Sequence, residues 1–127
     1  MWRYVIGVLL IGHGLANMAG LIAPWTKSTQ GFSDQPWIFS RGITLRSTVG
    51  RLFSLAWLLS TIGLVAGGVG LLTGQAWWWT ATLVGALASL VAIVPWWRTV
   101  PPGARAAAVI DVILYGFLLS PVSSRIL

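Results

Sequence analysis

The sequence contains no cysteine and only two acidic residues. Without cysteine, disulfides, thiolate metal sites, thiol redox chemistry and cysteine nucleophiles are excluded. Charged residues of either sign make up 8% of the 127 positions, whereas a soluble domain carries about 25%. So few charges cannot cover a surface that faces water. The sequence therefore predicts a chain whose surroundings are mostly lipid.

The sequence also has few of the residues that carry catalysis or metal binding. Its single histidine, His13, cannot supply a two-histidine metal or haem site. No serine–histidine–acid set stands in a recognisable context, and the glycine-rich segment 63–74 lacks the lysine of a phosphate-binding loop. We therefore expect no catalytic residue, no metal and no cofactor, and an enzyme ranks third among the functions considered.

Apolar residues are what the chain has in abundance, at 57% of the sequence. They gather in four segments that approach the roughly 20 residues a helix needs to cross a bilayer. The predicted spans are 4–23, 52–72, 78–97 and 104–120, the last being the shortest. We expect residues 1–127 to form one all-α domain, a multi-pass protein of the cell membrane with four antiparallel transmembrane helices. A long structured loop would join the first two helices.

The first apolar segment could instead be a signal peptide, because one arginine precedes it. No A-x-A motif precedes a credible cleavage point, and the segment is long enough to cross a bilayer. We therefore expect a retained helix.

Nine tryptophans mark the predicted membrane boundaries. Trp2 and Trp25 bracket the first span, and 77–79 and 96–97 bracket the third. Indole rings favour the headgroup region, and only Trp57 fits a core position better. Between the first two helices, the sequence predicts a turn at 33–36 and a short strand or surface-lying segment at 43–45.

The orientation of the chain stays open. Four spans would place Arg3 and Arg125 on one side of the membrane and the other six of the eight basic residues on the opposite side. The positive-inside rule then places the termini outside. A long, aromatic loop is nevertheless at least as typical of an extracellular face. The basic residues flank apolar runs and do not cluster, so we expect no nucleic-acid partner.

Each predicted span carries small residues at helical spacing, which allow helices to approach closely in lipid. These stripes are Gly12, Ala16, Ala19 and Ala23; Ala56, Ser60, Gly63, Gly67 and Gly70; Ala81, Gly85, Ala88 and Ala92; and Ala104, Ala108, Asp111 and Tyr115. We favour packing within the chain, although the same stripes could serve dimerisation.

Four polar side chains inside the predicted spans form the candidate site: His13, Asn17, Asp111 and Tyr115. Asn17 and Asp111 lie at similar depths, as do His13 and Tyr115, with Ser89 and Thr61 in the same middle band. We expect this cluster to converge, with Asn17 and His13 as first-ranked partners of Asp111. It would be either a structural link that fixes helix register or a pocket for a proton, a quinone head or a lipid head. The structural role ranks slightly ahead.

Three motifs resemble those of a group of small bacterial four-helix integral membrane proteins. They are IGHGLAN at 11–17, GFSDQPWIFSRGITLRSTVGRLFSLAWLL at 31–59, and WWW at 77–79. The first helix, with its pair His13-Gly14, also resembles the DoxX-like superfamily. That resemblance implies quinone-linked redox or accessory membrane roles. Members of the small group often carry a second histidine where this chain has Asn17. This departure is a further argument against a metal site.

We therefore expect a non-enzymatic membrane protein, either an accessory subunit or a binder of a small apolar ligand, a lipid or a quinone. The alternative is a small oligomeric transporter or channel in which His13 and Asp111 handle protons or ions. The expected partners are membrane lipid, a quinone or lipid ligand, and either further copies of the chain or a larger membrane complex.

Overall fold

The computed structural model describes residues 1–126, so Leu127, the last residue of the predicted domain, lies outside the described residues. Every regular element in this range is helical, which confirms the all-α prediction. The elements are α1 (Trp2–Ala16), α2 (Met18–Ile22), α3 (Thr48–Leu72), α4 (Trp78–Ile93) and α5 (Pro102–Leu118), with 3-10 turns at Val94–Trp96 and Ser123–Arg125. Each predicted span is helical, with ends displaced by a few residues.

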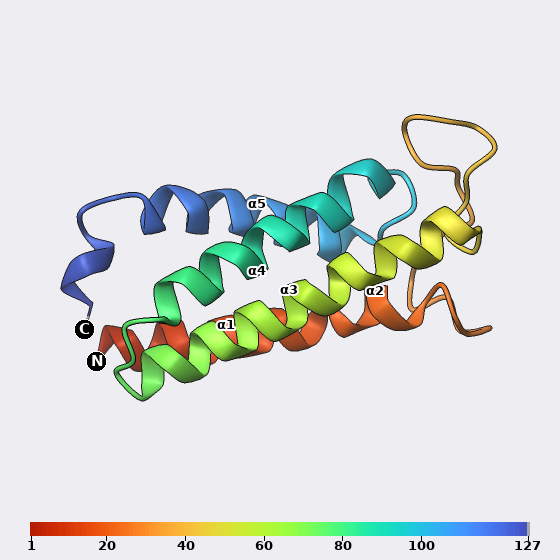
Figure 1. Cartoon of the computed structure of the whole chain (residues 1–127). Coiled ribbons are helices and arrows are strands. Elements are labelled where there is room, and N and C mark those ends of the chain that lie inside the picture. The colour runs from red at the N-terminus through yellow and green to blue at the C-terminus, as the bar shows by residue number, and fades with distance from the viewer. Residues whose placement is uncertain (127) are drawn as a thin grey trace.

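The helices lie side by side in an elongated bundle, and the chain reverses direction from α1 to α3, from α3 to α4 and from α4 to α5 (Figure 1). Both chain ends therefore lie at the same end of the bundle. Residues 23–47 contain no helix or strand and lie at the opposite end. The short strand considered for 43–45 is wrong, because these residues are irregular. The surface-lying alternative does not hold for Leu45, which is buried in the core.

Three helical segments are long and apolar enough to cross a membrane: Trp2–Ile22 with 21 residues, Thr48–Leu72 with 25 and Trp78–Trp96 with 19. The first of these combines α1 and α2, which are separated only at Asn17. The backbone N–H of Asn17 is shared between the carbonyls of His13 and Gly14. These segments indicate a membrane protein. Helix α5 is shorter, with 17 residues.

Local sequence explains where the helices begin and end. The Ser47 side chain accepts a hydrogen bond from the N–H of Gly50 and so caps the start of α3. Pro102 opens α5, where its missing N–H costs no intrahelical bond. At the end of α3, Gly74 adopts φ +72°, a left-handed conformation that suits glycine, and turns the chain towards α4.

Helix α3 is the central helix, packing against α1, α2 and α4, while α5 packs against α4. Small residues let α3 and α4 approach closely: a Cβ atom added to Gly63 would lie 2.6 Å from the Cα atom of Gly85. A Cβ atom on Gly67 would overlap the Oγ1 atom of Thr82. The small-residue stripes predicted for these two helices therefore do form a helix contact.

The stripe predicted for the first helix is wrong at Gly12 and Ala16, whereas Ala23 is buried in the core and Ala19 packs against it. Gly12 and Ala16 are exposed, and a Cβ atom on Gly12 would meet no atom within 4 Å. The contact with α3 is made instead by Gly7, Gly14 and Gly20. Both faces of this helix carry small residues, so composition alone could not show which one meets α3.

Two tryptophans predicted to lie at the membrane interface are instead buried. Trp78 and Trp96 belong to the apolar core, whereas Trp2 and Trp25 are exposed, as interfacial residues would be. Trp96 lies beside Trp37 from the long loop, with ring centroids 5.9 Å apart. The loop is thus anchored to the bundle by aromatic packing, which explains why Trp96 is buried, whereas Trp78 packs in a separate apolar cluster with Leu71 and Leu118.

Candidate functional site

His13 of α1 and Asp111 of α5 form a direct pair. The Nε2 atom of His13 lies 2.8 Å from the Oδ1 atom of Asp111, and the side chains are 12% and 0% exposed. The bond holds one proton in either of two ways: an Nε2–H group donates to the carboxylate, or a protonated carboxyl donates to Nε2. This pair is the part of the predicted cluster that the structure brings together.

The second carboxyl oxygen of Asp111, Oδ2, is buried without a hydrogen-bond partner among residues 1–126. Buried polar atoms in folded proteins are nearly always hydrogen-bonded, and an ionisable group within a membrane is costly unless it is partnered. His13 is therefore the side chain on which the placement of Asp111 depends.

Of the two first-ranked partners of Asp111, only His13 meets it, and Asn17 does not. Its Nδ2 group donates to the Oγ atom of Ser60 at 2.7 Å and lies 3.4 Å from the Oγ atom of Ser89. All three side chains are buried. Residues four apart on an α-helix are rotated by roughly 40°, so His13 reaches α5 while Asn17 reaches α3 and α4.

Tyr115 lies one turn beyond Asp111 and is partly buried beside the apolar cluster that contains Leu10 and Leu118. Its hydroxyl has no hydrogen bond to His13 or Asp111 in the described chain. The four predicted residues are thus divided between a His13–Asp111 pair, an asparagine–serine network and a separate tyrosine.

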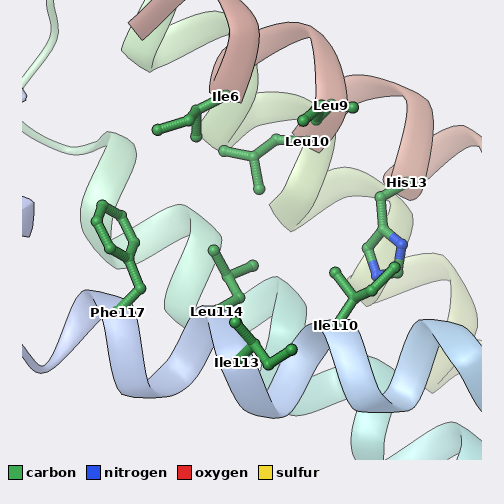
Figure 2. Close-up of a pocket in the computed structure, with 8 residues that line it drawn as sticks. All are labelled: Ile6, Leu9, Leu10, His13, Ile110, Ile113, Leu114 and Phe117. Atoms are coloured by element: carbon green, nitrogen blue, oxygen red, sulfur yellow. The ribbon is translucent and has the colours of Figure 1, made fainter. Parts of the chain in front are cut away.

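An apolar groove lies between α1 and α5, with His13 at one end and Phe117 towards the other (Figure 2). It has a volume of about 310 Å³ and is lined by Ile6, Leu9, Leu10, His13, Ile110, Ile113, Leu114 and Phe117. It exists because α5 packs on α4 and touches α1 only sparsely. Leu10 is buried at its floor, whereas Leu9 and Ile113 are exposed at its rims.

A smaller cavity of about 210 Å³ lies on the other side of the His13–Asp111 pair, again between the first helical segment and α5. Its lining includes Asn17, Gly20, Trp57 and Ala104. The His13–Asp111 pair therefore bridges the two helices between two cavities, one wholly apolar apart from His13 and one that includes Asn17.

The groove was not predicted from the sequence. Seven of its eight lining residues are apolar, and an apolar residue that faces a groove has the same sequence pattern as one that faces lipid. Among them, only His13 stood out in the sequence, as a polar residue within an apolar span.

No three histidine, cysteine, aspartate or glutamate side chains come together within residues 1–126, so the His13–Asp111 pair offers at most two metal ligands.

The chain matches no family model, no curated protein and no solved structure. The resemblance to small bacterial four-helix proteins and to the DoxX-like superfamily therefore stays a prediction, and function is inferred from the site alone.

Proposed function

We propose that the chain is a multi-pass protein of the cell membrane in which α5 makes a fourth crossing. Two hydrogen bonds support this proposal. At one end, Arg105 donates from Nε to the carbonyl of Trp97 at 2.9 Å. At the other end, Trp79 donates from Nε1 to the carbonyl of Leu118 at 2.9 Å. Helix α5 is thereby matched in depth to α4, and its 17 residues give a length of about 25 Å.

We further propose that the protein is a non-enzymatic binder of an apolar chain, a lipid tail or a quinone tail, held in the α1–α5 groove. The observation that carries this proposal is the groove itself. Its volume of about 310 Å³ lies within the range of small-molecule sites, roughly 300 to 1,000 Å³. Its lining offers one polar group, His13, and that group is already engaged by Asp111.

An accessory role follows from the same geometry. Apart from His13, the lining side chains contain no nucleophile, acid or base, so the groove is suited to holding a molecule without changing it. The protein would hold or present its ligand within a larger membrane complex or an assembly of several copies.

Photolabelling would test occupancy of the groove. The probe is a phospholipid with a diazirine at the end of one acyl chain, added to the protein in bicelles, with labelled positions mapped by mass spectrometry. Ile113→Trp should fill the groove and reduce labelling of Leu10 and Leu114 several-fold. Val112→Trp is the matched control, because Val112 and Ile113 are 60% and 66% exposed but only Ile113 lines the groove. Equal labelling in the two variants would contradict the proposal.

Two observations favour a second candidate function, proton or ion transport. The buried Oδ2 atom of Asp111 has no hydrogen-bond partner in residues 1–126, and the pair stands between two cavities. Purified protein in liposomes with an internal pH dye would then acidify the lumen under a proton gradient. Asp111→Asn should abolish that flux, and Asp34→Asn in the exposed loop should not. Flux no higher than in empty liposomes would remove this candidate.

A further inference from the structure

We propose that the groove belongs to a site for one anionic phospholipid. The phosphate lies between Arg3 and Arg125, and one acyl chain runs along the α1–α5 groove to His13. This inference rests on the proposed function, because it names the ligand of the same groove.

The groove continues into a second cavity at the end of the bundle that carries both termini. That cavity has a volume of about 540 Å³ and is lined by Met1, Trp2, Arg3, Ile6, Phe117, Val122, Arg125 and Ile126. Ile6 and Phe117 line both cavities. An apolar groove with two arginines at its mouth matches a molecule with an anionic head and an apolar tail.

Neither arginine has a side-chain carboxylate to neutralise it. The sequence contains two acidic residues: Asp34, which lies in the loop at the opposite end, and Asp111, which is bonded to His13. The Nη2 group of Arg3 donates to the carbonyl of Leu72 at 3.2 Å and to the hydroxyl of Tyr4 at 3.4 Å, while its buried Nε has no partner in the described chain. Arginine is suited to phosphate because its planar donors match phosphate oxygens.

The length of the groove fits one leaflet. His13 lies ten positions after Arg3, which corresponds to about 15 Å along a helix, or half of a bilayer core about 30 Å thick. Trp2 is exposed next to Arg3 and marks the headgroup depth. An acyl chain that starts at the arginines would therefore end near His13. A quinone whose ring met His13 would make no use of the arginines.

Native mass spectrometry would test the headgroup assignment. The protein in detergent is mixed with equal amounts of phosphatidylglycerol and phosphatidylcholine of identical chains, and retained lipids are counted. We expect one phosphatidylglycerol per chain, preferred on the order of tenfold over phosphatidylcholine, because each arginine near a membrane surface favours an anionic lipid. Arg3→Gln with Arg125→Gln should bring the preference close to parity. Arg41→Gln with Arg98→Gln, two exposed positions at the opposite end, should leave it unchanged.

Different results would overturn the two proposals. No preference in the unmodified protein, or a preference insensitive to both arginines, would overturn the headgroup site, while a loss of bound lipid in Ile113→Trp would still support the groove. Retention of lipid unchanged in Ile113→Trp would overturn the groove and the inference together. Arg125 is exposed, so Arg125→Gln alone keeps the test decisive if the double variant does not fold.

Discussion

His13 and Asp111 make the one side-chain hydrogen bond that joins α1 to α5 within residues 1–126. Elsewhere along this boundary the helices are separated by the two cavities. The pair therefore fixes the distance between the helices at the inner end of the groove. A structural role and a ligand-binding role are thus compatible at this residue pair, because the bond that joins α1 to α5 lies at the inner end of the groove.

The first prediction concerns the strength of this bond. His13→Leu and Asp111→Leu should each destabilise the protein, and the double variant should be more stable than the sum of the single effects predicts. Hydrogen bonds between membrane helices average about 0.6 kcal/mol and reach about 1.7, so a coupling of about 1 kcal/mol is expected. Unfolding in mixed micelles would measure it. Strict additivity would mean that the two side chains do not meet.

Asn17 provides the complementary prediction. It bonds Ser60 and has no bond to Asp111, so Asn17→Leu and Ser60→Ala should be coupled. Asn17→Leu and Asp111→Leu should instead add to within about 0.5 kcal/mol. The same unfolding assay applies. Coupling between Asn17 and Asp111 that exceeds the Asn17–Ser60 coupling would contradict the observed arrangement.

For single residues, the sequence showed which polar side chains lie within the apolar spans, but not which of them meet. A polar side chain in an apolar span is conspicuous, so His13, Asn17 and Asp111 could be identified at once. Their partners depend on helix rotation: a difference of roughly 40° sends Asn17 to two serines and leaves His13 for Asp111. The position of a residue in the sequence gives its depth within the membrane, but it does not give the direction in which the side chain points around the helix axis.

Among the helices, the contact between α3 and α4 depends on glycine. Gly67→Leu should destabilise the fold by about 1 to 3 kcal/mol, as overpacked positions do, because the new side chain would overlap Thr82. Gly12→Leu is the matched control, since a Cβ atom there meets nothing within 4 Å. Thermal melts in detergent would compare the two. Equal melting temperatures would mean that the Gly67 face does not contact another helix.

Helices themselves were predictable because long apolar runs and prolines mark their extents. The faces on which they pack were predictable only where one stripe of small residues stood out, as in α3 and α4. In α1, small residues surround the helix, and the face that meets α3 had to be seen in the structure. The burial of Trp78 and Trp96 was missed for a related reason, because a tryptophan at a helix end can face the headgroups or pack inside the protein. Trp96 packs against the loop, and Trp78 packs in the apolar core.

For the whole molecule, the fourth crossing is the feature to test. The chain lacks cysteine, so single cysteines can be introduced and labelled with an impermeant maleimide in oriented vesicles. Gln75→Cys and Ser124→Cys should be labelled from one side, and Ser40→Cys from the other, because α5 returns the chain to the end where α1 begins. Labelling of Ser124→Cys from the same side as Ser40→Cys would mean that α5 does not cross.

Composition was sufficient to predict a membrane protein, since so little charge leaves no other environment for the exposed apolar residues. It could not reveal the groove, which arises from how α5 is placed against α4 and away from α1. The groove is therefore the feature that most needs a direct measurement.

Methyl NMR of the protein in bicelles tests directly whether an apolar chain occupies the α1–α5 groove. Leu10 and Leu71 are 4% and 0% exposed, but only Leu10 lines the groove. If the groove holds a lipid chain, the Leu10 methyls will show nuclear Overhauser contacts to acyl methylenes, the Leu71 methyls will not, and Ile113→Trp will remove the Leu10 contacts. Leu10 methyls as free of lipid contacts as those of Leu71 would contradict the account.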